Sequence, residues 1–295
     1  MPDIPYEKLG GLERPKDERD FPLGATYVPV KRPSTLGADM SWFKRNWQAQ
    51  IPTCGPHALS HDKAVQDHAS VPSLSPRYTP RFTGIRMKDP RSPVYDGYAP
   101  DAGTDMRHLF QAAVAGQNTF APLENDTLLP LAQYLDPSVL TPAMLAESKN
   151  NLIKSYAFDE TPGGPTYDSI ADAVNQWKAV ILLIKCDEGF WGTSTPTFTT
   201  PKYGHFILAY DWDDNTGELL IVDSAEPDEQ FALKRIAKQY IQPQFFLEAG
   251  TTVDIPPSIK QVLSHPQLTP QQKISITQQI LTDIAEILQD MKKEI

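Results

Sequence analysis

Three residues, Cys54, His205 and Asp223, have the types and local settings that nucleophilic catalysis by a thiol requires. A cysteine becomes a useful nucleophile when it is held as a thiolate, and a helix N-terminus and a neighbouring imidazolium both favour that charge. A carboxylate that accepts a hydrogen bond from one imidazole nitrogen orients the ring, so that the other nitrogen faces the sulfur. Such a triad would carry out acyl transfer through a covalent intermediate.

The segments around these residues predict the elements that must position them. Over residues 53–68, apolar and small residues recur at helical spacing and Pro56 suits a first helical turn, so a helix begins at or next to Cys54. His205 lies near the start of an apolar, β-rich run, and Asp223 ends the next such run. Across one antiparallel hairpin, the last two positions can face each other.

The chain changes character after its middle. Before residue 179 the sequence predicts mainly helices and loops, and four apolar, β-rich runs follow. A helical half followed by an antiparallel sheet predicts an α+β fold, with a cleft between the halves as the natural place for a site. We expect helices at 53–68, after Thr104 as N-cap, near 141–150 and at 168–178, a long loop at 70–103, and strands at 179–186, 204–212, 217–223 and 244–248.

Both ends of the chain are expected to lie outside the core, which covers residues 41–250. Residues 1–40 hold many Pro, Gly and charged residues without periodicity, which predicts an extended arm wrapped on the core or on a partner. A Pro-containing linker, residues 251–268, leads to an amphipathic helix at 269–295. This helix has a broad apolar stripe, and exposing the stripe to water would be unfavourable. We therefore expect the helix to dock on the core or on another chain, as in a homo-oligomer or larger assembly.

The bulk composition excludes several classes of protein. The formal charge of −10 and the pI near 5.1 argue against a nucleic-acid-binding surface, which needs clustered Lys and Arg. No stretch approaches the roughly 18 consecutive apolar residues of a membrane span, and the first residues lack the pattern of a signal peptide. Two cysteines cannot form a disulfide framework, so a reducing compartment such as the cytoplasm is the simpler expectation.

The segment before the cysteine narrows the chemistry. Gln48-Ala-Gln-Ile-Pro-Thr-Cys54 resembles the papain family's glutamine placed six residues before its nucleophile. The runs that hold His205 and Asp223 resemble the family's histidine strand and its asparagine-serine motif. The 151 residues from Cys54 to His205 are close to the roughly 130–150 of papain-type enzymes. The resemblance covers about residues 15–250 and is to a divergent, bacterial or bacteriophage-type cysteine peptidase of this C1-type family.

This resemblance implies a papain-like fold of two parts and an oxyanion hole formed by the Gln48 side chain and the Cys54 backbone N–H. Several positions depart from the family pattern. Asp223 stands where asparagine is commoner, and Ser224-Ala-Glu226 replaces the Ser-Trp-Gly that shields the triad. The tryptophan after the nucleophile is absent, and there is no clear match to the glycine pair that binds the substrate backbone.

Other motifs have simpler interpretations than metal sites, and neither a metal nor a cofactor is expected. Cys186 lies on an apolar run and is expected to pack in the core. Segment 211–217 alternates oxygen-bearing side chains as a calcium loop does, but its glycine is one position late and the closing Glu is missing, which favours a hairpin turn. His57, His61 and His68 follow Cys54 at helical spacing, but they lack the companion Glu and further ligands of a zinc site, which favours a solvated or packed face. The aromatic residues at 190–198 either line the cleft or pack on the surface.

Three functional hypotheses follow. In the first, the chain is a thiol peptidase: Cys54 attacks a peptide carbonyl, His205 protonates the leaving amine and then activates water, and Asp223 keeps His205 oriented. In the second, the same residues carry out another Cys-dependent acyl transfer, such as transglutaminase-like chemistry, which the 151-residue separation disfavours. In the third, the chain is a structural or interaction protein of a larger assembly, for example a bacteriophage particle, with a papain-like scaffold.

Overall fold

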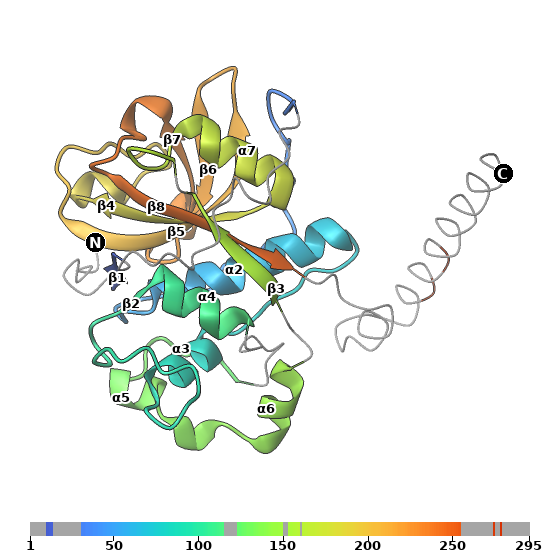
Figure 1. Cartoon of the computed structure of the whole chain (residues 1–295), viewed down its shortest axis with the longest axis vertical. Coiled ribbons are helices and arrows are strands. Elements are labelled where there is room, and N and C mark those ends of the chain that lie inside the picture. Colours follow the sequence, from blue (N-terminus) through green and yellow to red (C-terminus); the bar gives the residue numbers. More distant parts are fainter. Residues whose placement is uncertain are drawn as a thin grey trace.

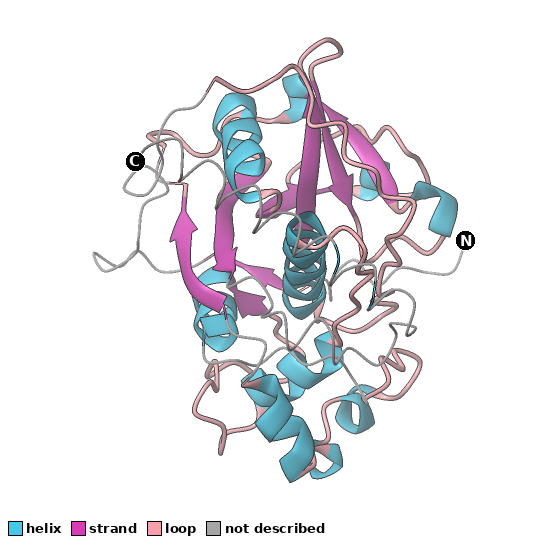
Figure 2. Ribbon diagram, turned by 90° about the vertical axis from the view of Figure 1, so that its right-hand side faces the viewer, coloured by secondary structure: helices cyan, strands magenta, loops and turns pink. Residues whose placement is uncertain are grey.

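The computed structural model describes residues 10–13, 31–114, 123–149, 153–159 and 161–254, together with Ile274 and Gln278. Strands gather in one half of the molecule and most helices in the other, with the long helix α2 between them (Figures 1 and 2). The expected α+β arrangement is therefore confirmed. The described helices are α2 (Cys54–Ser70), α3 (Pro80–Lys88), α4 (Met106–Val114), α5 (Leu131–Tyr134), α6 (Pro142–Ser148) and α7 (Tyr167–Trp177), with short 3-10 helices η2 (Pro137–Val139), η3 (Glu188–Phe190), η4 (Glu229–Phe231) and η5 (Lys238–Tyr240).

Among the described residues, six strands form one antiparallel sheet in the order β3-β8-β4-β5-β6-β7. Four of them lie where strands are expected, although β8 begins later than expected and continues past residue 250. The sequence did not predict β3 or β7, because both are short and carry charged residues inside the apolar pattern. The strands are β3 (Ile153–Phe158), β4 (Val180–Cys186), β5 (Tyr203–Asp213), β6 (Glu218–Val222), β7 (Leu233–Ala237) and β8 (Phe246–Asp254).

Strand β4 is apolar because both of its faces are covered. Val180, Leu182 and Ile184 belong to a core cluster that also contains the buried residues of α7. Ile181 and Leu183 point to the opposite face, where they join a second cluster with α2 and α4. Successive side chains of a strand alternate between faces, so an unbroken apolar run marks a strand buried on both sides.

The helical half has its own core, and two expectations about it are wrong. The segment 70–103 is not one long loop, because α3 lies within it and buries Phe82 and Ile85. Thr104 is not the N-cap of α4, because it lies in the two-residue strand β2 (Thr104–Asp105). The Asp105 carboxylate instead accepts a hydrogen bond from the backbone N–H of His108 at 3.0 Å, as an N-cap does.

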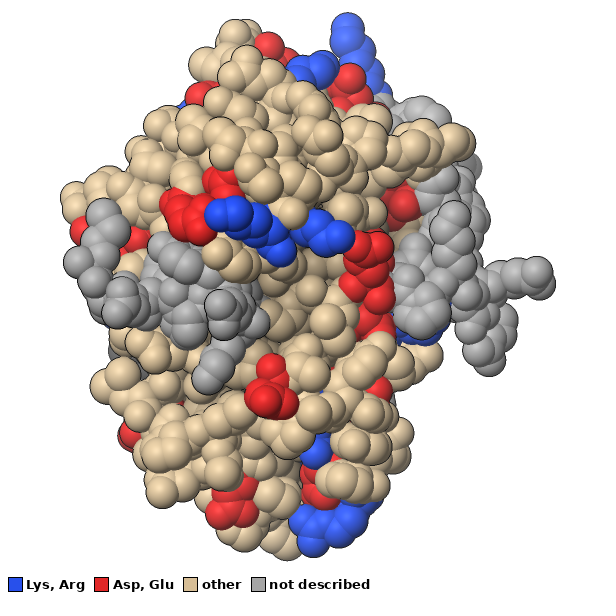
Figure 3. All heavy atoms as spheres, turned by 90° about the vertical axis from the view of Figure 1, so that its left-hand side faces the viewer, with Lys and Arg blue, Asp and Glu red and all other residues tan. Residues whose placement is uncertain are grey.

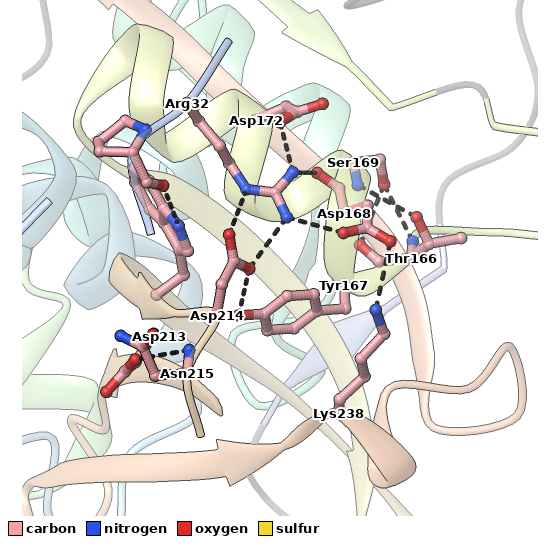
Figure 4. Close-up of polar contacts among 12 residues, drawn as sticks. Arg32, Thr166, Tyr167, Asp168, Ser169, Asp172, Asp213, Asp214, Asn215 and Lys238 are labelled. Atoms are coloured by element: carbon pink, nitrogen blue, oxygen red, sulfur yellow. Dashed lines mark hydrogen bonds and ion pairs between the residues drawn. The ribbon is translucent and has the colours of Figure 1, made fainter. Parts of the chain in front are cut away.

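Residues 31–40 lie against the sheet half, where an arginine holds them (Figure 4). The Arg32 guanidinium pairs with Asp168 and Asp172 of α7 at 2.7 and 2.6 Å and with Asp214 of the β5–β6 turn at 3.0 Å. One cation thus joins the arm, a helix and a hairpin. The remainder of the expected arm lies outside the described residues, apart from residues 10–13.

The acidic segment 211–217 contains the end of β5 at Asp213 and the expected hairpin turn, which leads to β6 at Glu218. Gly217 has a φ of +68° and donates its N–H to the Asp213 carbonyl at 2.7 Å. The Asp211 carboxylate accepts the backbone N–H groups of Leu36 and Ala38 at 2.9 and 2.8 Å, so it anchors residues 31–40. Within the residues that the structure describes, no group of three or more His, Cys, Asp or Glu is placed to hold a metal.

The expected linker and C-terminal helix cannot be compared in full. Residues 251–254 belong to β8, and the linker beyond them lies outside the described residues. Of the expected helix at 269–295, only Ile274 and Gln278 are described, and both are helical. Over the described parts of the chain, no helix is long and apolar enough to cross a membrane.

The layered core makes a prediction about stability. Leu182→Ala should lower the free energy of unfolding by about 2–5 kcal/mol, because the side chain is fully buried and its loss leaves a cavity. Leu233→Ala, on edge strand β7 and 39% exposed, is the matched control and should change it by less than about 0.5 kcal/mol. Urea denaturation of both variants measures the effect, and equal losses would contradict this packing.

Candidate active site

Cys54 is the first residue of α2, as the sequence predicts. Its side chain therefore lies at the positive end of the helix dipole, which favours a thiolate. The first turn of α2 packs tightly against Thr104, because a Cβ on Gly55 would lie 2.8 Å from the Thr104 Cγ2. Cys54 is fully buried in the core cluster that joins α2, α4 and the sheet.

His205 and Asp223 are brought together by the β5–β6 hairpin. His205 lies near the start of β5, and Asp223 follows the last residue of β6. The His205 Nε2 and the Asp223 Oδ1 are 2.8 Å apart, and both side chains are fully buried. The same carboxylate oxygen accepts the backbone N–H of Ala225 at 2.9 Å, which fixes its direction.

The pKa values of this pair favour opposite charges. Burial alone lowers the pKa of His205, but the hydrogen bond to Asp223 and the interaction with Cys54, together with their negative charges, raise it to about 9. Burial alone raises the pKa of Asp223, yet His205 and Lys234 hold it below its usual value. The three side chains Cys54, His205 and Asp223 therefore form one electrostatically coupled group.

Aromatic rings from the segment 190–198, which the sequence placed either in the cleft or on the surface, cover the histidine. The ring centroids of Phe190 and Trp191 lie 6.0 and 6.2 Å from that of His205. Phe198 packs on Phe190, and all three aromatic residues are buried in the sheet-side core. They therefore pack inside rather than on the surface.

Gln48 is held against the turn that follows Asp223. The Ser224 hydroxyl donates to the Gln48 Oε1 at 3.1 Å, and the Gln48 backbone N–H donates to the Ser224 carbonyl at 2.8 Å. The Gln48 side-chain NH₂ donates to the Ile51 carbonyl at 2.6 Å, inside a tight turn where Ala49 has a φ of +51°. A non-glycine residue in this region costs free energy, so the surrounding packing must hold the turn.

Arg45 joins the same two segments and was not singled out from the sequence. Its guanidinium donates to the Asp223 carbonyl at 3.1 Å and also to the Glu226 carbonyl. Its Nε donates to the Glu229 carboxylate at 2.7 Å. A single arginine in a sequence carries no signal of such a role, because the role depends on carbonyls about 180 residues away in the chain.

Two of the three histidines of α2, His57 and His61, are buried and make hydrogen bonds inside the protein. The His57 Nδ1 lies 2.7 Å from the Thr53 carbonyl oxygen, and the His61 Nε2 accepts the Asn46 backbone N–H at 2.9 Å. Burial lowers the pKa of His57 to about 4, which favours the neutral ring. The packed face is confirmed, and Cys186 is likewise buried on β4.

A short segment from the N-terminal part of the chain lies beside His205. Strand β1 (Gly11–Leu12) pairs in parallel with β2, and the Thr104 N–H donates to the Gly10 carbonyl at 2.9 Å. The approach to β5 is so close that a Cβ on Gly11 would lie 2.9 Å from the His205 backbone nitrogen. An extended backbone therefore fits between β2 and the start of β5.

Comparisons with known proteins identify the fold. No protein-family model and no curated protein matches the chain. Xylellain, a cysteine protease from Xylella fastidiosa, superimposes with a TM-score of 0.66 at 14% identity over 86% of this chain and 99% of its own. Procathepsin L2, a digestive proteinase from Tenebrio molitor, superimposes with a TM-score of 0.57 at 15% identity over 85% and 80% of the two chains.

The fold is that of the papain-like cysteine proteases. A second Tenebrio molitor proteinase, procathepsin L 3, gives a TM-score of 0.53 at 15% identity over 84% of this chain and 77% of its own. At these identities the likeness concerns the fold. The expected papain-like arrangement of helices and antiparallel sheet is thereby confirmed.

The raised pKa of His205 makes stability depend on pH. A folded-state pKa of about 9, above the value of about 6.5 in an unfolded chain, gives stabilisation that is complete below about pH 6.5 and lost as the pH approaches 9. The difference in unfolding free energy between the wild type and His205→Gln should therefore shrink across that window. A difference that stays constant between about pH 5 and about pH 10 would contradict a protonated His205.

Strand β1 packs on the start of β5 beside His205, and from this position we expect it to limit access to Cys54. Gly11→Ala should loosen the segment, because its Cβ would lie within 3 Å of Gly204, His205 and Leu183 atoms. Cys54 alkylation by iodoacetamide should then accelerate, by about tenfold for each 1.4 kcal/mol of strain relieved on opening. Gly84→Ala, whose Cβ would make only ordinary contacts, is the control. Equal rates in both variants would show that β1 does not cover the thiol.

Proposed function

We propose that this chain is a cysteine peptidase that hydrolyses peptide bonds through an acyl-enzyme on Cys54. The observation that carries the proposal is the buried hydrogen bond of 2.8 Å between His205 and Asp223, in a histidine that also interacts electrostatically with a cysteine at a helix N-terminus. A thiol, a base and an orienting carboxylate in this order form the arrangement that thiol-dependent acyl transfer needs.

In the proposed first step, the Cys54 sulfur attacks the carbonyl carbon while His205 carries the proton. The oxyanion of the tetrahedral intermediate is stabilised by the Cys54 backbone N–H and by a Gln48 side-chain N–H. His205 gives its proton to the leaving amine, which departs as the C–N bond breaks. The acyl group remains on sulfur as a thioester.

In the proposed second step, His205 is neutral and accepts a proton from water. The hydroxide attacks the thioester carbonyl, the C–S bond breaks and the carboxylic acid leaves, so the thiolate and the imidazolium are restored. Asp223 keeps one ring nitrogen occupied throughout, which fixes the tautomer and the direction of the other nitrogen.

The way in which β1 lies beside His205 supports a peptide as the substrate. An extended backbone pairs there with Thr104 and packs on Gly204 and His205. The side of the molecule shown in Figure 3 carries Lys and Arg interspersed with Asp and Glu, not a basic patch of the kind that nucleic acid needs. The named activities of xylellain and the procathepsins, as cysteine protease and proteinases, agree with this proposal.

The proposal predicts the behaviour of a thiol-directed probe. A peptidyl epoxide should label the wild type once, and Cys54→Ala should abolish labelling and hydrolysis of a casein substrate. Cys186→Ala is the matched control and should retain both, because that thiol is buried on β4. A folded wild-type protein that neither labels nor cleaves would contradict the proposal. Products formed only when an amine is added would indicate acyl transfer to amines instead of hydrolysis.

A further inference from the structure

Lys234 of β7 is buried beside the proposed catalytic group. Its ammonium lies 2.7 Å from the Glu226 Oε2, 3.1 Å from the Thr193 carbonyl oxygen and 3.7 Å from the Asp223 Oδ2. It also lies 5.1 Å from the centroid of the Phe190 ring, one of the rings that cover His205. Its side chain has no exposed area, and a lysine is rarely buried in this way unless it is paired.

The Asp223 carboxylate uses its two oxygens differently. Its Oδ1 accepts from the His205 Nε2 and the Ala225 N–H. Its Oδ2 is buried and has no hydrogen-bond partner among the described residues. The Lys234 ammonium is the cation that faces this second oxygen, at a distance that gives attraction without a formal hydrogen bond.

We propose that Lys234, held in place by Glu226, is a positioning residue that keeps the Asp223 carboxylate ionised and correctly turned toward His205. This inference rests on the proposed function, since it concerns the same Cys54–His205–Asp223 group. Lys234 touches neither Cys54 nor the reacting atoms in this role. It acts through Asp223.

The aspartate at position 223 explains why a buried lysine stands beside it. An asparagine, which is commoner at the position of Asp223, is neutral and needs no counter-charge when buried. An aspartate at the same position needs one, because a buried carboxylate without a cation shifts its pKa upward and becomes protonated. A protonated Asp223 would no longer stabilise the imidazolium of His205. The imidazolium is itself one counter-charge, and Lys234 is a second, which stays beside the carboxylate when His205 gives up its proton.

Other charged and titratable groups face this pair from the surrounding elements, and they define the background of any pH measurement. Arg45 bonds the Asp223 backbone carbonyl rather than its carboxylate. Glu226 also accepts the Gly192 and Asp228 backbone N–H groups, so its own position is set independently of Lys234. Cys54, Cys186, His57 and His61 also interact electrostatically with His205 or Asp223.

The test removes the cation without leaving a lone buried anion. The double variant Lys234→Met with Glu226→Gln deletes both charges of the pair while keeping the bulk of the side chains. Arg235→Met, which breaks the exposed ion pair with Glu218 on the same strand, is the matched control. The same double change in an Asp223→Asn background asks whether the effect passes through the carboxylate.

Two measurements are made on each variant: the pH dependence of kcat/KM for a peptide substrate, and the titration of the Asp223 carboxyl carbon followed by NMR. In the double variant, the acid limb of kcat/KM and the Asp223 titration should both move up by about one pH unit or more, because an opposite charge at this distance shifts a carboxyl pKa by about 1–3 units. Lys234→Arg, which keeps a positive charge at this position, should show only part of the shift. Neither Arg235→Met nor the changes in the Asp223→Asn background should move the acid limb.

The outcomes separate this inference from the proposed function. An unchanged Asp223 titration in a folded double variant overturns the inference, whatever the activity. If the Asp223 titration shifts in the double variant but the wild type never cleaves peptide, the inference stands, because Lys234 still keeps Asp223 ionised. The peptidase proposal is then the one that is wrong. An acid limb that moves equally in the Asp223→Asn background would show a structural effect of Lys234 and would also overturn the inference.

Discussion

The hydrogen bond between His205 and Asp223 places an imidazolium and a carboxylate in a region without exposed surface. Two charges in such a place are stable only if their geometry is good and their remaining atoms are satisfied. Much of the structure around the site meets that requirement. The hairpin brings the two side chains together, the Ala225 N–H binds the carboxylate, the rings of Phe190 and Trp191 cover the imidazole, and Lys234 faces the second carboxylate oxygen.

The turn after β6 connects this pair to the segment that precedes α2. Ser224 binds Gln48 through both its hydroxyl and its carbonyl, and Arg45 binds the carbonyls of Asp223 and Glu226. The proposed oxyanion donor and the proposed base are thus held by one short stretch of chain. Such coupling explains how the unfavourable backbone conformation at Ala49 can persist next to the cysteine, because several hydrogen bonds oppose its relaxation.

The fold tolerates large sequence divergence, since structures at 14–15% identity share it over most of this chain. What persists in such cases is the pattern of burial rather than the identity of each side chain. Strand β4 illustrates this, because alternate residues enter two separate cores and any apolar residues of suitable size could do so. Function is then carried by a few positioned side chains on a common framework.

The sequence by itself determined the central features. The helix at Cys54, the strands β4, β5 and β6 and the hairpin turn between the last two follow from periodicity and turn chemistry, which act over a few residues. Cys54, His205 and Asp223 could be proposed because each stands beside such a local signal, and Gln48 because its spacing from Cys54 resembles a family pattern. Local patterns failed for α3, whose burial depends on a separate core, and for the short strands β3 and β7.

Only the tertiary structure decided which other residues surround the site. Lys234, Glu226 and Arg45 stand in no pattern that marks them, and Arg45 lies far from the other two in the sequence. The aromatic run at 190–198 was visible in the sequence, but that Phe190 and Trp191 lie beside His205 was not. The physical reason is that a buried charge is compensated by whatever group lies near it in space. Distance and burial determine that compensation, and neither can be read from the order of residues along the chain.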